Sequence, residues 1–416
     1  MVGDKFDIYV FADWIGLDEP ALIGMLSAHY AKGRKAFSFE YDQNWLKTDA
    51  QQVLDPDIQF YSGPQYAVNK ENFGIFLDSM PDTWGRTLMK RREANEARSK
   101  GEKAKVLYET DYLLGVYDES RMGALRFKTD LAGSFLDDNK DNPTPPWSSL
   151  GELQDAVHHI EQDDQSDAIK KWIAILIAPG SSLGGARPKA NILDKHKHLW
   201  IAKFPSANDT IDKAAWEYLA YLLAIESGIE MSASKIRKIR GKHHTFLTKR
   251  FDRNGSGRIH FASAMTMTGN TEEIIKDTPP SYLEIVEFIE TFGVNVKENL
   301  HQLWRRIVFN IAISNTDDHL RNHGFILTDK GWILSPAYDL NPSIDKDGLA
   351  INIDMDSNAL DYDLAKSVGA YFRLKEAEMN VIIDEVRKVV GTWKTVADKI
   401  GISAQEQQLM EAAFRI

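Results

Sequence analysis

The sequence contains no cysteine among its 416 residues. This absence excludes disulfide bonds, thiol nucleophiles and thiolate metal ligands, and it fits a reducing compartment. Long hydrophobic runs are also missing, because the longest apolar stretches, such as WIAILIAP and IVFNIAI, are too short to span a bilayer. The opening residues, MVGDKFDIYVFADW, lack the pattern of a signal peptide. We therefore expect a cytoplasmic protein with no membrane partner.

An excess of positive charge is lacking as well, since the formal net charge is −11 at pH 7. A chain of this charge is not expected to bind nucleic acid broadly by itself, although a local basic patch could. The basic run KRREANEARSKGEKAK at residues 90–105 is the strongest such patch. We interpret it as the solvated face of a helix, with nucleic-acid contact as the alternative.

Several familiar ligand motifs are absent. No G-K-S or G-K-T occurs, which excludes a Walker A loop. The GSG at 255–257 has His260 where a dinucleotide loop needs its third glycine, so it predicts a hairpin turn. The DRNGSG that begins at Asp252 lacks the glutamate of a calcium loop, because its twelfth position is Ser263. No H-E-x-x-H pattern supports a zinc site.

What is present is a large apolar fraction, 43% of the residues, enough for the cores of two or three domains or lobes. The pattern predicts an α+β fold in which mixed strands and helices precede a mostly helical part. The predicted parts are residues 1–128, a linker rich in Asp, Asn and Pro at 129–148, a second mixed part at 149–260 and a helical part at 261–416.

Local patterns predict individual elements. LLGVYDESRMGALRF at 113–127 indicates strand, turn and strand, and the segment after Ser149 indicates a helix with a capping box to Glu152. HLWIAKFP predicts a strand, and 212–229 predicts a helix that ends at a glycine. HTFLTKRFDRNGSGRIHF predicts strand, turn and strand, and GFILTDKGWIL predicts a hairpin that turns at 329–331.

One polar stretch lies between apolar segments that look like core, in SNTDDHLRNHGFILTDKGWILSPAYDL at 314–340. Asp317 and Asn322 are five positions apart, and Asp339 follows the predicted hairpin. Phosphoryl transfer needs a carboxylate near the attacking hydroxyl and oxygen ligands for Mg²⁺, which an Asn and a second Asp supply. The alternative is a solvated turn with helix caps, since the D-x-x-x-x-N spacing is common.

A second constellation lies earlier in the chain. GSSLGGARPK contains the adjacent glycines Gly184 and Gly185, whose backbone N–H groups could face phosphate, although an ordinary loop has the same composition. Lys203 lies between apolar residues of a predicted strand, where a lysine is costly to bury unless it meets an anion. Glu217 on the next helix is its natural partner. The alternative for Lys203 is a side chain that reaches solvent from an edge strand.

In order, the chain presents a Gly-rich loop, a strand Lys, a helix Glu, TKRFDR, D-x-H-x-x-N and SPAYDL. This order resembles the HipA family of bacterial toxin kinases. The likeness extends to LDSMPDTWGR and LLGVYDESRMGALRF, which resemble segments that precede the kinase core of that family. The resemblance implies a two-lobed, protein-kinase-like fold with an N-terminal subdomain, and transfer of the γ-phosphoryl group of ATP to Ser or Thr.

The resemblance also assigns roles to individual residues. It makes Asp317 the catalytic base, with His319 in the same motif, and leaves Asp318 as the neighbouring candidate. It makes Asn322 and Asp339 the Mg²⁺ ligands. The remaining implied positions are Lys203 at the ATP phosphates, the backbones of Lys249 and Phe251 at adenine, Asp252 at the ribose, and Ser182 as the autophosphorylated serine, with Ser181 as the alternative acceptor.

Partners follow from the same resemblance. It implies a small helix-turn-helix antitoxin similar to HipB, operator DNA read mainly by that antitoxin, and an aminoacyl-tRNA synthetase as a protein substrate. Two alternatives stay open, a catalytically weak co-repressor and a kinase for a small molecule. At Arg187–Pro188 this sequence differs from many relatives, which have other polar residues there. The difference concerns the regulation that the resemblance implies for Ser182.

Overall fold

The protein is analysed as a computed structural model that describes residues 4–31, 34–68, 70, 72–140, 143–162, 173, 176 and 185–416. The chain forms two units, and each combines segments that are distant in sequence. The first comprises residues 1–207, 252–262 and 327–329, and the second comprises 208–251, 263–326 and 330–416. The predicted division at 128, 148 and 260 places the boundaries elsewhere and stays a prediction.

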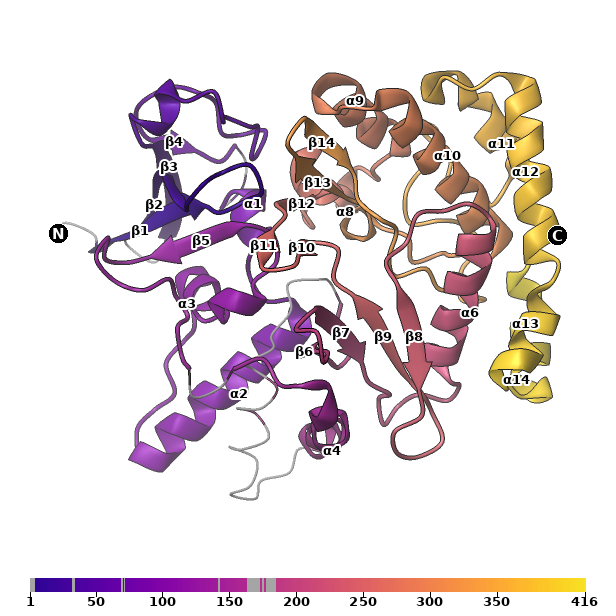
Figure 1. The fold of residues 1–416 in the computed structure, drawn as a ribbon, viewed down its shortest axis with the longest axis horizontal. Helices are drawn as coiled ribbons and strands as arrows, with labels where there is room; N and C mark the ends of the chain where they lie inside the picture. Colours follow the sequence, from indigo (N-terminus) through magenta and orange to yellow (C-terminus); the bar gives the residue numbers. More distant parts are fainter. Residues whose placement is uncertain are drawn as a thin grey trace. The chain divides into compact units, whose positions relative to one another are not determined.

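The first unit contains a five-stranded antiparallel sheet of order β4-β3-β2-β1-β5 (Figure 1). Alternate residues of a strand point to the same side of a sheet, and here the alternate positions on one side are apolar. Ile8, Val10 and Leu26 are examples, and all three are fully buried. Its strands are β1 (Asp4–Ala12), β2 (Ala21–Ala31), β3 (Arg34–Tyr41), β4 (Gln65–Tyr66) and β5 (Leu125–Lys128).

The first unit also contains helices. They are α1 (Gly74–Asp78), α2 (Thr83–Lys100), α3 (Glu109–Leu114) and α4 (Leu150–Glu161), with short 3-10 turns at Trp45–Lys47, Asp118–Ser120 and Trp147–Ser149. The hairpins β6 (Lys189–Leu193) with β7 (Leu199–Lys203), and β10 (Arg253–Asn254) with β11 (Gly257–Arg258), complete this unit. The second hairpin confirms the turn predicted at 255–257.

Two local predictions in this unit are wrong. Leu113 and Leu114 end helix α3 rather than begin a strand, because the Asp111 carboxylate accepts the Tyr108 N–H at 2.8 Å and starts a helix. The helix after Ser149 exists, but the Ser149 side chain makes no cap bond. A 3-10 turn runs directly into this helix, so Ser149 has a helical backbone and not the extended one that a capping box needs.

The second unit is mostly helical, as predicted, and is built around the long helix α10. One face of this helix is apolar and fully buried, with Trp304, Ile307 and Ile311 at helical spacing. Its helices are α6 (Lys213–Glu226), α7 (Ala264–Met267), α8 (Ile274–Asp277), α9 (Tyr282–Phe292), α10 (Val296–Ala312), α11 (Tyr362–Ser367), α12 (Glu376–Val390), α13 (Trp393–Ile400) and α14 (Ala404–Met410).

Short strands accompany these helices. The strands β8 (Ser234–Arg237) and β9 (Thr245–Lys249) pair antiparallel, and β13 (Gly324–Thr328) and β14 (Gly331–Leu334) form the predicted hairpin. Gly331 has a φ of 131°, which explains the glycine at that turn. The strand β12 (Phe261–Ser263) precedes α7, and 3-10 turns occur at Leu320–Asn322, Gly369–Phe372 and Glu411–Ala413. None of the helices in the part of the chain that the structure describes is long and apolar enough to cross a membrane.

Candidate active site

Asp317 and Asp318 lie in the loop that follows α10, and the structure separates their roles. Asp317 is exposed. Asp318 is only 1% exposed, and its carboxylate accepts hydrogen bonds from Asn310 Nδ2 at 2.9 Å, from His323 Nε2 at 2.8 Å and from the Tyr282 hydroxyl. Burial and the adjacent Asp318 carboxylate raise the pKa of Tyr282 well above its ordinary value. Asp318 is therefore a structural carboxylate that anchors the loop, whereas Asp317 faces solvent.

The side chain of Asn322 closes this loop. It is 7% exposed, and its Nδ2 donates to the backbone carbonyl of Asp317 at 3.1 Å. The Asn322 backbone N–H also donates to the His319 carbonyl at 2.8 Å within the 3-10 turn. The amide nitrogen is thus used inside the loop, and a metal ion would have to bind the amide oxygen. His319 is half-buried, and its Nδ1 finds no hydrogen-bond partner among the residues that the structure describes.

Asp339 belongs to a second segment that is tied to this loop. The hydroxyl of Tyr338 donates to the Arg321 carbonyl at 2.7 Å, which links the residue before Asp339 to the residue before Asn322. The half-buried Asp339 has a φ of 58°, in the left-handed region that non-glycine residues rarely adopt, and its Oδ1 accepts from Asn341 Nδ2 at 3.1 Å. Such backbone strain is often found at functional positions.

These side chains fit a magnesium ion. An amide oxygen and a carboxylate are the hard oxygen donors that Mg²⁺ prefers, and one or two protein ligands suffice where phosphates and water complete the shell. The part of the chain that the structure describes contains no group of three His, Asp or Glu side chains placed to hold a metal. A metal at Asn322 and Asp339 would therefore need oxygen ligands from a bound phosphate.

A chain of asparagines connects the two segments and was not found from the sequence. Asn310 Oδ1 accepts from Asn315 Nδ2 at 3.0 Å, and Asn315 Oδ1 accepts the Asn341 N–H at 3.4 Å. Asn310 also binds Asp318, and Asn341 also binds Asp339. The three asparagines therefore form a hydrogen-bond network that connects the loop to the Asp339 segment. The only sequence signal was the density of Asn residues around the motif.

The predicted phosphate-binding residues fall in the first unit or outside the described residues. Ser181, Ser182 and Gly184 lie outside the described residues. Gly185 has a φ of 97°, a conformation that favours glycine. The predicted strand is present as β7, but Lys203 is its last residue and not a middle one, and it is half-buried.

Lys189, next to this glycine loop, has a structural partner. Its ammonium group lies 2.7 Å from the Asp82 carboxylate, and both side chains are 3% exposed. Burial raises the pKa of Asp82, although the Lys189 charge opposes that shift. A buried, hydrogen-bonded pair of this kind ties the start of α2 to the start of β6.

The residues predicted around the nucleotide base lie in both units. Lys249 ends β9, and the Phe251 ring packs 5.7 Å from the Tyr338 ring in the second unit. Asp252, in the first unit, is fully buried, and its Oδ2 accepts the Gly123 N–H at 2.8 Å and Arg253 Nη1 at 2.7 Å. This carboxylate thus holds a turn of the first unit, and its contact with a ribose stays a prediction. Glu217 is 6% exposed in α6, and its pairing with Lys203 also stays a prediction.

Comparison with known proteins gives a family for this chain. The family model described as the HipA-like C-terminal domain matches residues 181–393. A Haemophilus influenzae protein described as a possible kinase is 27% identical over an alignment of 179 residues, and the match covers 38% of this chain and 52% of that protein. A Sinorhizobium fredii protein, also described as a possible kinase, is 32% identical over an alignment of 157 residues, and the match covers 36% of each chain. The chain thus spans about half or less of the length of the curated relatives it matches.

Among solved structures, a chain of the Shewanella oneidensis MR-1 toxin–antitoxin complex of HipA, HipB and its operator DNA is similar along nearly its whole length. The similarity has a TM-score of 0.63 at 17% identity, and it covers 98% of this chain and 94% of that one. At this identity the likeness establishes the fold, and it confirms the predicted mixed α/β, kinase-like architecture.

Proposed function

Because this chain belongs to the HipA-like C-terminal domain family, we propose that it is an ATP- and Mg²⁺-dependent serine/threonine protein kinase that acts as the toxin of a toxin–antitoxin pair. The observation that carries the proposal is the loop of Asp317 and Asn322. An exposed carboxylate sits on a loop closed by the Asn322-to-Asp317 bond and anchored by the buried Asp318. A solvated turn would need neither the closing amide nor the buried anchor.

In the proposed reaction Asp317 accepts the proton of the acceptor hydroxyl. The hydroxyl oxygen forms a bond to the γ-phosphorus of ATP, and the bond from that phosphorus to the β,γ-bridging oxygen breaks, which releases ADP. Fixing the Asp317 backbone through Asn322 limits the positions that the carboxylate can take, which favours a productive geometry.

Asn322 and Asp339 would hold the metal ion. When bound, Mg²⁺ neutralises the charge of the phosphates during transfer. The Tyr338–Arg321 hydrogen bond and the asparagine network hold the Asn322 and Asp339 segments together. Gly185 and Lys203 would bind phosphate oxygens, Glu217 would orient Lys203, and the backbones of Lys249 and Phe251 would meet adenine.

Partners are proposed from the family. The similar S. oneidensis chain forms a complex with HipB and operator DNA, which supports an antitoxin partner for this chain too. The net charge of −11 fits a division of labour in which the antitoxin contacts the DNA phosphates. The proposed phosphate acceptor is a component of translation such as an aminoacyl-tRNA synthetase.

Ser182 is the proposed autophosphorylation site, with Ser181 as the alternative. A phosphate adds about −1.5 to −2 charges to a loop that would otherwise surround anionic phosphates. Repulsion between this group and ATP would weaken nucleotide binding and switch the kinase off. The Ser182→Ala variant would then stay active for longer in the presence of ATP.

The test is incubation of the purified chain with ATP and MgCl₂, followed by peptide mass spectrometry and measurement of ADP. Phosphoserine or phosphothreonine that disappears when EDTA is added is the expected result. ADP production without any phosphorylated protein, in the presence of candidate small hydroxyl compounds, would instead favour the small-molecule kinase. No transfer to any acceptor, together with tight antitoxin binding, would favour the co-repressor.

A further inference from the structure

Helix α6, which carries Glu217, is held at its first turn by a residue almost two hundred positions later. One carboxylate oxygen of Glu406, Oε2, accepts the Asp212 N–H at 3.2 Å and the Trp216 indole N–H at 3.1 Å. Asp212 is the N-cap of α6, and its Oδ1 accepts the Ala215 N–H at 3.2 Å. Glu406 therefore binds both the cap and the first turn of the helix.

An aromatic stack fixes the same turn. The Trp216 ring lies 6.1 Å from that of Trp393 and 6.2 Å from that of Phe414, and those two rings stack on each other at 4.2 Å with an interplanar angle of 6°. Trp216 and Trp393 are each 2% exposed. Consecutive residues of an α-helix point about 100° apart, so a fixed Trp216 also fixes the direction of Glu217.

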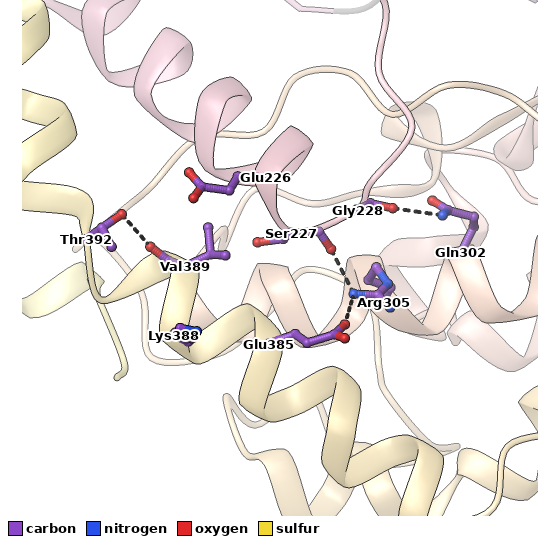
Figure 2. Close-up of a pocket in the computed structure, with 9 residues that line it drawn as sticks. All are labelled: Glu226, Ser227, Gly228, Gln302, Arg305, Glu385, Lys388, Val389 and Thr392. Carbon is purple, nitrogen blue, oxygen red and sulfur yellow. Dashed lines mark hydrogen bonds and ion pairs between the residues drawn. The ribbon is translucent and has the colours of Figure 1, made fainter.

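The other end of α6 is held by α10 and α12, around a cavity of about 560 Å³ (Figure 2). Arg305 Nη1 donates to the Ser227 carbonyl at 2.8 Å and to Glu385 at 2.9 Å, and Gln302 Nε2 donates to the Gly228 carbonyl at 2.9 Å. A cation at the carbonyl end of a helix also interacts favourably with the helix dipole. With both ends bound, α6 has a defined position within its unit, and Figure 1 shows it running beside α13.

The segment 403–416, which contains Glu406 and Phe414, also reaches the loop of the catalytic motif. The Arg415 N–H donates to the Ala312 carbonyl at 2.8 Å, and Arg415 Nε donates to the Ser314 hydroxyl at 3.1 Å. Ser314 has a φ of 48°, and it lies three residues before Asp317. The same segment thus contacts the helix that carries Glu217 and the loop that carries Asp317.

We propose that segment 403–416 is a clasp that holds α6 and the Asp317 loop in the arrangement that phosphoryl transfer requires. This proposal rests on the proposed kinase function. Glu406, Phe414 and Arg415 are positioning residues, because they act through Glu217 and Asp317 and would touch neither ATP nor the acceptor.

The physical reason concerns α6, because this helix carries Glu217, a residue of the proposed ATP site. A helix that is free to rotate presents Glu217 to the nucleotide for only a fraction of the time. The apparent affinity for ATP falls by that fraction. Any change that loosens the hold of this segment on α6 should therefore weaken ATP binding before it disturbs the acceptor site.

The test compares Glu406→Ala with the conservative Glu406→Gln and with Gln405→Ala, a change at an exposed residue of the same helix. Glu406→Ala should raise KM for ATP about fivefold to tenfold and leave KM for the protein acceptor unchanged. Glu406→Gln should recover the wild-type KM, because its amide oxygen can still accept both hydrogen bonds. Arg415→Ala should lower kcat about threefold with little change in KM for ATP.

Hydrogen–deuterium exchange of peptides from 213–226 gives a second readout that does not need catalysis. Exchange should be faster in Glu406→Ala than in the wild type and unchanged in Gln405→Ala. Unchanged exchange in Glu406→Ala overturns the clasp. A loss of activity in Glu406→Ala with the KM values for ATP and for the protein acceptor both preserved also overturns it, because that result indicates only a smaller folded fraction. If the wild type transfers no phosphate, the kinase proposal falls, and the exchange measurement still decides whether Glu406 holds α6.

Discussion

Asp317 and Asp318 are neighbours in sequence but have opposite environments, since Asp317 is exposed and Asp318 is 1% exposed with three side-chain donors on its carboxylate. The pair explains why so many charges lie between core segments. One carboxylate offsets the cost of its burial by organising the loop, and the other is exposed, where the proposed reaction would use it. Exchanging their roles would leave the three donors of Asp318 without an acceptor in the interior.

The two aspartates should therefore respond differently to replacement by alanine. Asp317→Ala should abolish phosphoryl transfer, a loss of at least about a hundredfold, with folding and ATP–Mg²⁺ binding nearly unchanged, because a base acts mainly in the transition state. Asp318→Ala should lower stability by about 3 kcal/mol, because it leaves buried donors unpaired. Transfer assays and thermal melts of both variants check this. Wild-type activity in Asp317→Ala would show that another residue is the base.

Asp339→Ala should weaken nucleotide binding as well as turnover. Loss of a metal ligand loosens the hold on the β- and γ-phosphates, so we expect ATP affinity in the presence of MgCl₂ to fall about tenfold or more. Calorimetry with and without MgCl₂ measures the effect. Asp345→Ala, at an exposed carboxylate of the following segment, is the control. Equal affinity and turnover in Asp339→Ala and wild type would remove Asp339 from the site.

Arg121 should be a large contributor to the stability of the first unit. Its fully buried guanidinium donates to the carbonyls of Ser79, Leu113, Val116 and Leu136 at 2.8–3.0 Å. Burial lowers its pKa to about 10, so it stays charged at neutral pH. Arg121→Met should cost about 3–5 kcal/mol, because four buried acceptors lose their donor. Arg92→Met, at a partly exposed ion pair, should cost less than about 0.5 kcal/mol. Similar melting temperatures for the two variants would contradict this role.

Local patterns predicted much of the fold because they depend on neighbours in sequence. The β13–β14 hairpin follows from a glycine at a turn between two apolar runs, and α6 follows from its apolar spacing and the glycine after it. Helix α3 was missed because its start depends on a single carboxylate, Asp111, upstream of the segment that looked like a strand.

The candidate site could be predicted only in part for a related reason. The spacing of Asp317 and Asn322 is local, and the structure places their side chains in one loop. The burial of Asp318 depends on Tyr282 and Asn310, which come from two different helices, and no local pattern indicates that contact. The Glu406–Trp216 bond spans 190 positions and is invisible without the fold.

Asp55 predicts a pH dependence of stability in the first unit. Burial raises its pKa from 3.8 to about 6, although the N–H groups of Asp57 and Ile75 donate to it. The folded state thus holds this proton more tightly than the unfolded state. The contribution of protonated Asp55 to the free energy of unfolding is complete below about pH 4 and is lost as the pH rises through about 6. A pKa shift of about two units corresponds to about 3 kcal/mol of stability.

The variant Asp55→Asn cannot titrate at this position. Its stability relative to the wild type should therefore increase as the pH rises from 4 to 7, whatever its stability at any single pH. Melting temperatures at four pH values measure the trend, with Asp49→Asn at an exposed position as the control. A relative stability that is flat across this range would mean that Asp55 titrates alike in both states.

Lys203 should matter for ATP and little for stability. In the β6–β7 pair Lys203 lies directly opposite Lys189, and like charges at opposed positions destabilise a strand pair. Lys189 is bound to Asp82, and removal of the Lys203 charge relieves the repulsion between the two opposed positions. Lys203→Met keeps the apolar stem and removes the charge, so the melting temperature should stay constant or rise.

The same change should remove the cation that offsets the phosphate charge. We expect ATP affinity and kcat/KM to fall together, with kcat/KM lower by about a hundredfold. Lys195→Met, at an exposed position between the same strands, should change neither quantity. Calorimetry with ATP and MgCl₂, beside thermal melts, separates the two effects. A Lys203→Met protein that melts early but binds ATP normally would identify Lys203 as a structural lysine, because its charge would then stabilise the strand pair and not bind the nucleotide.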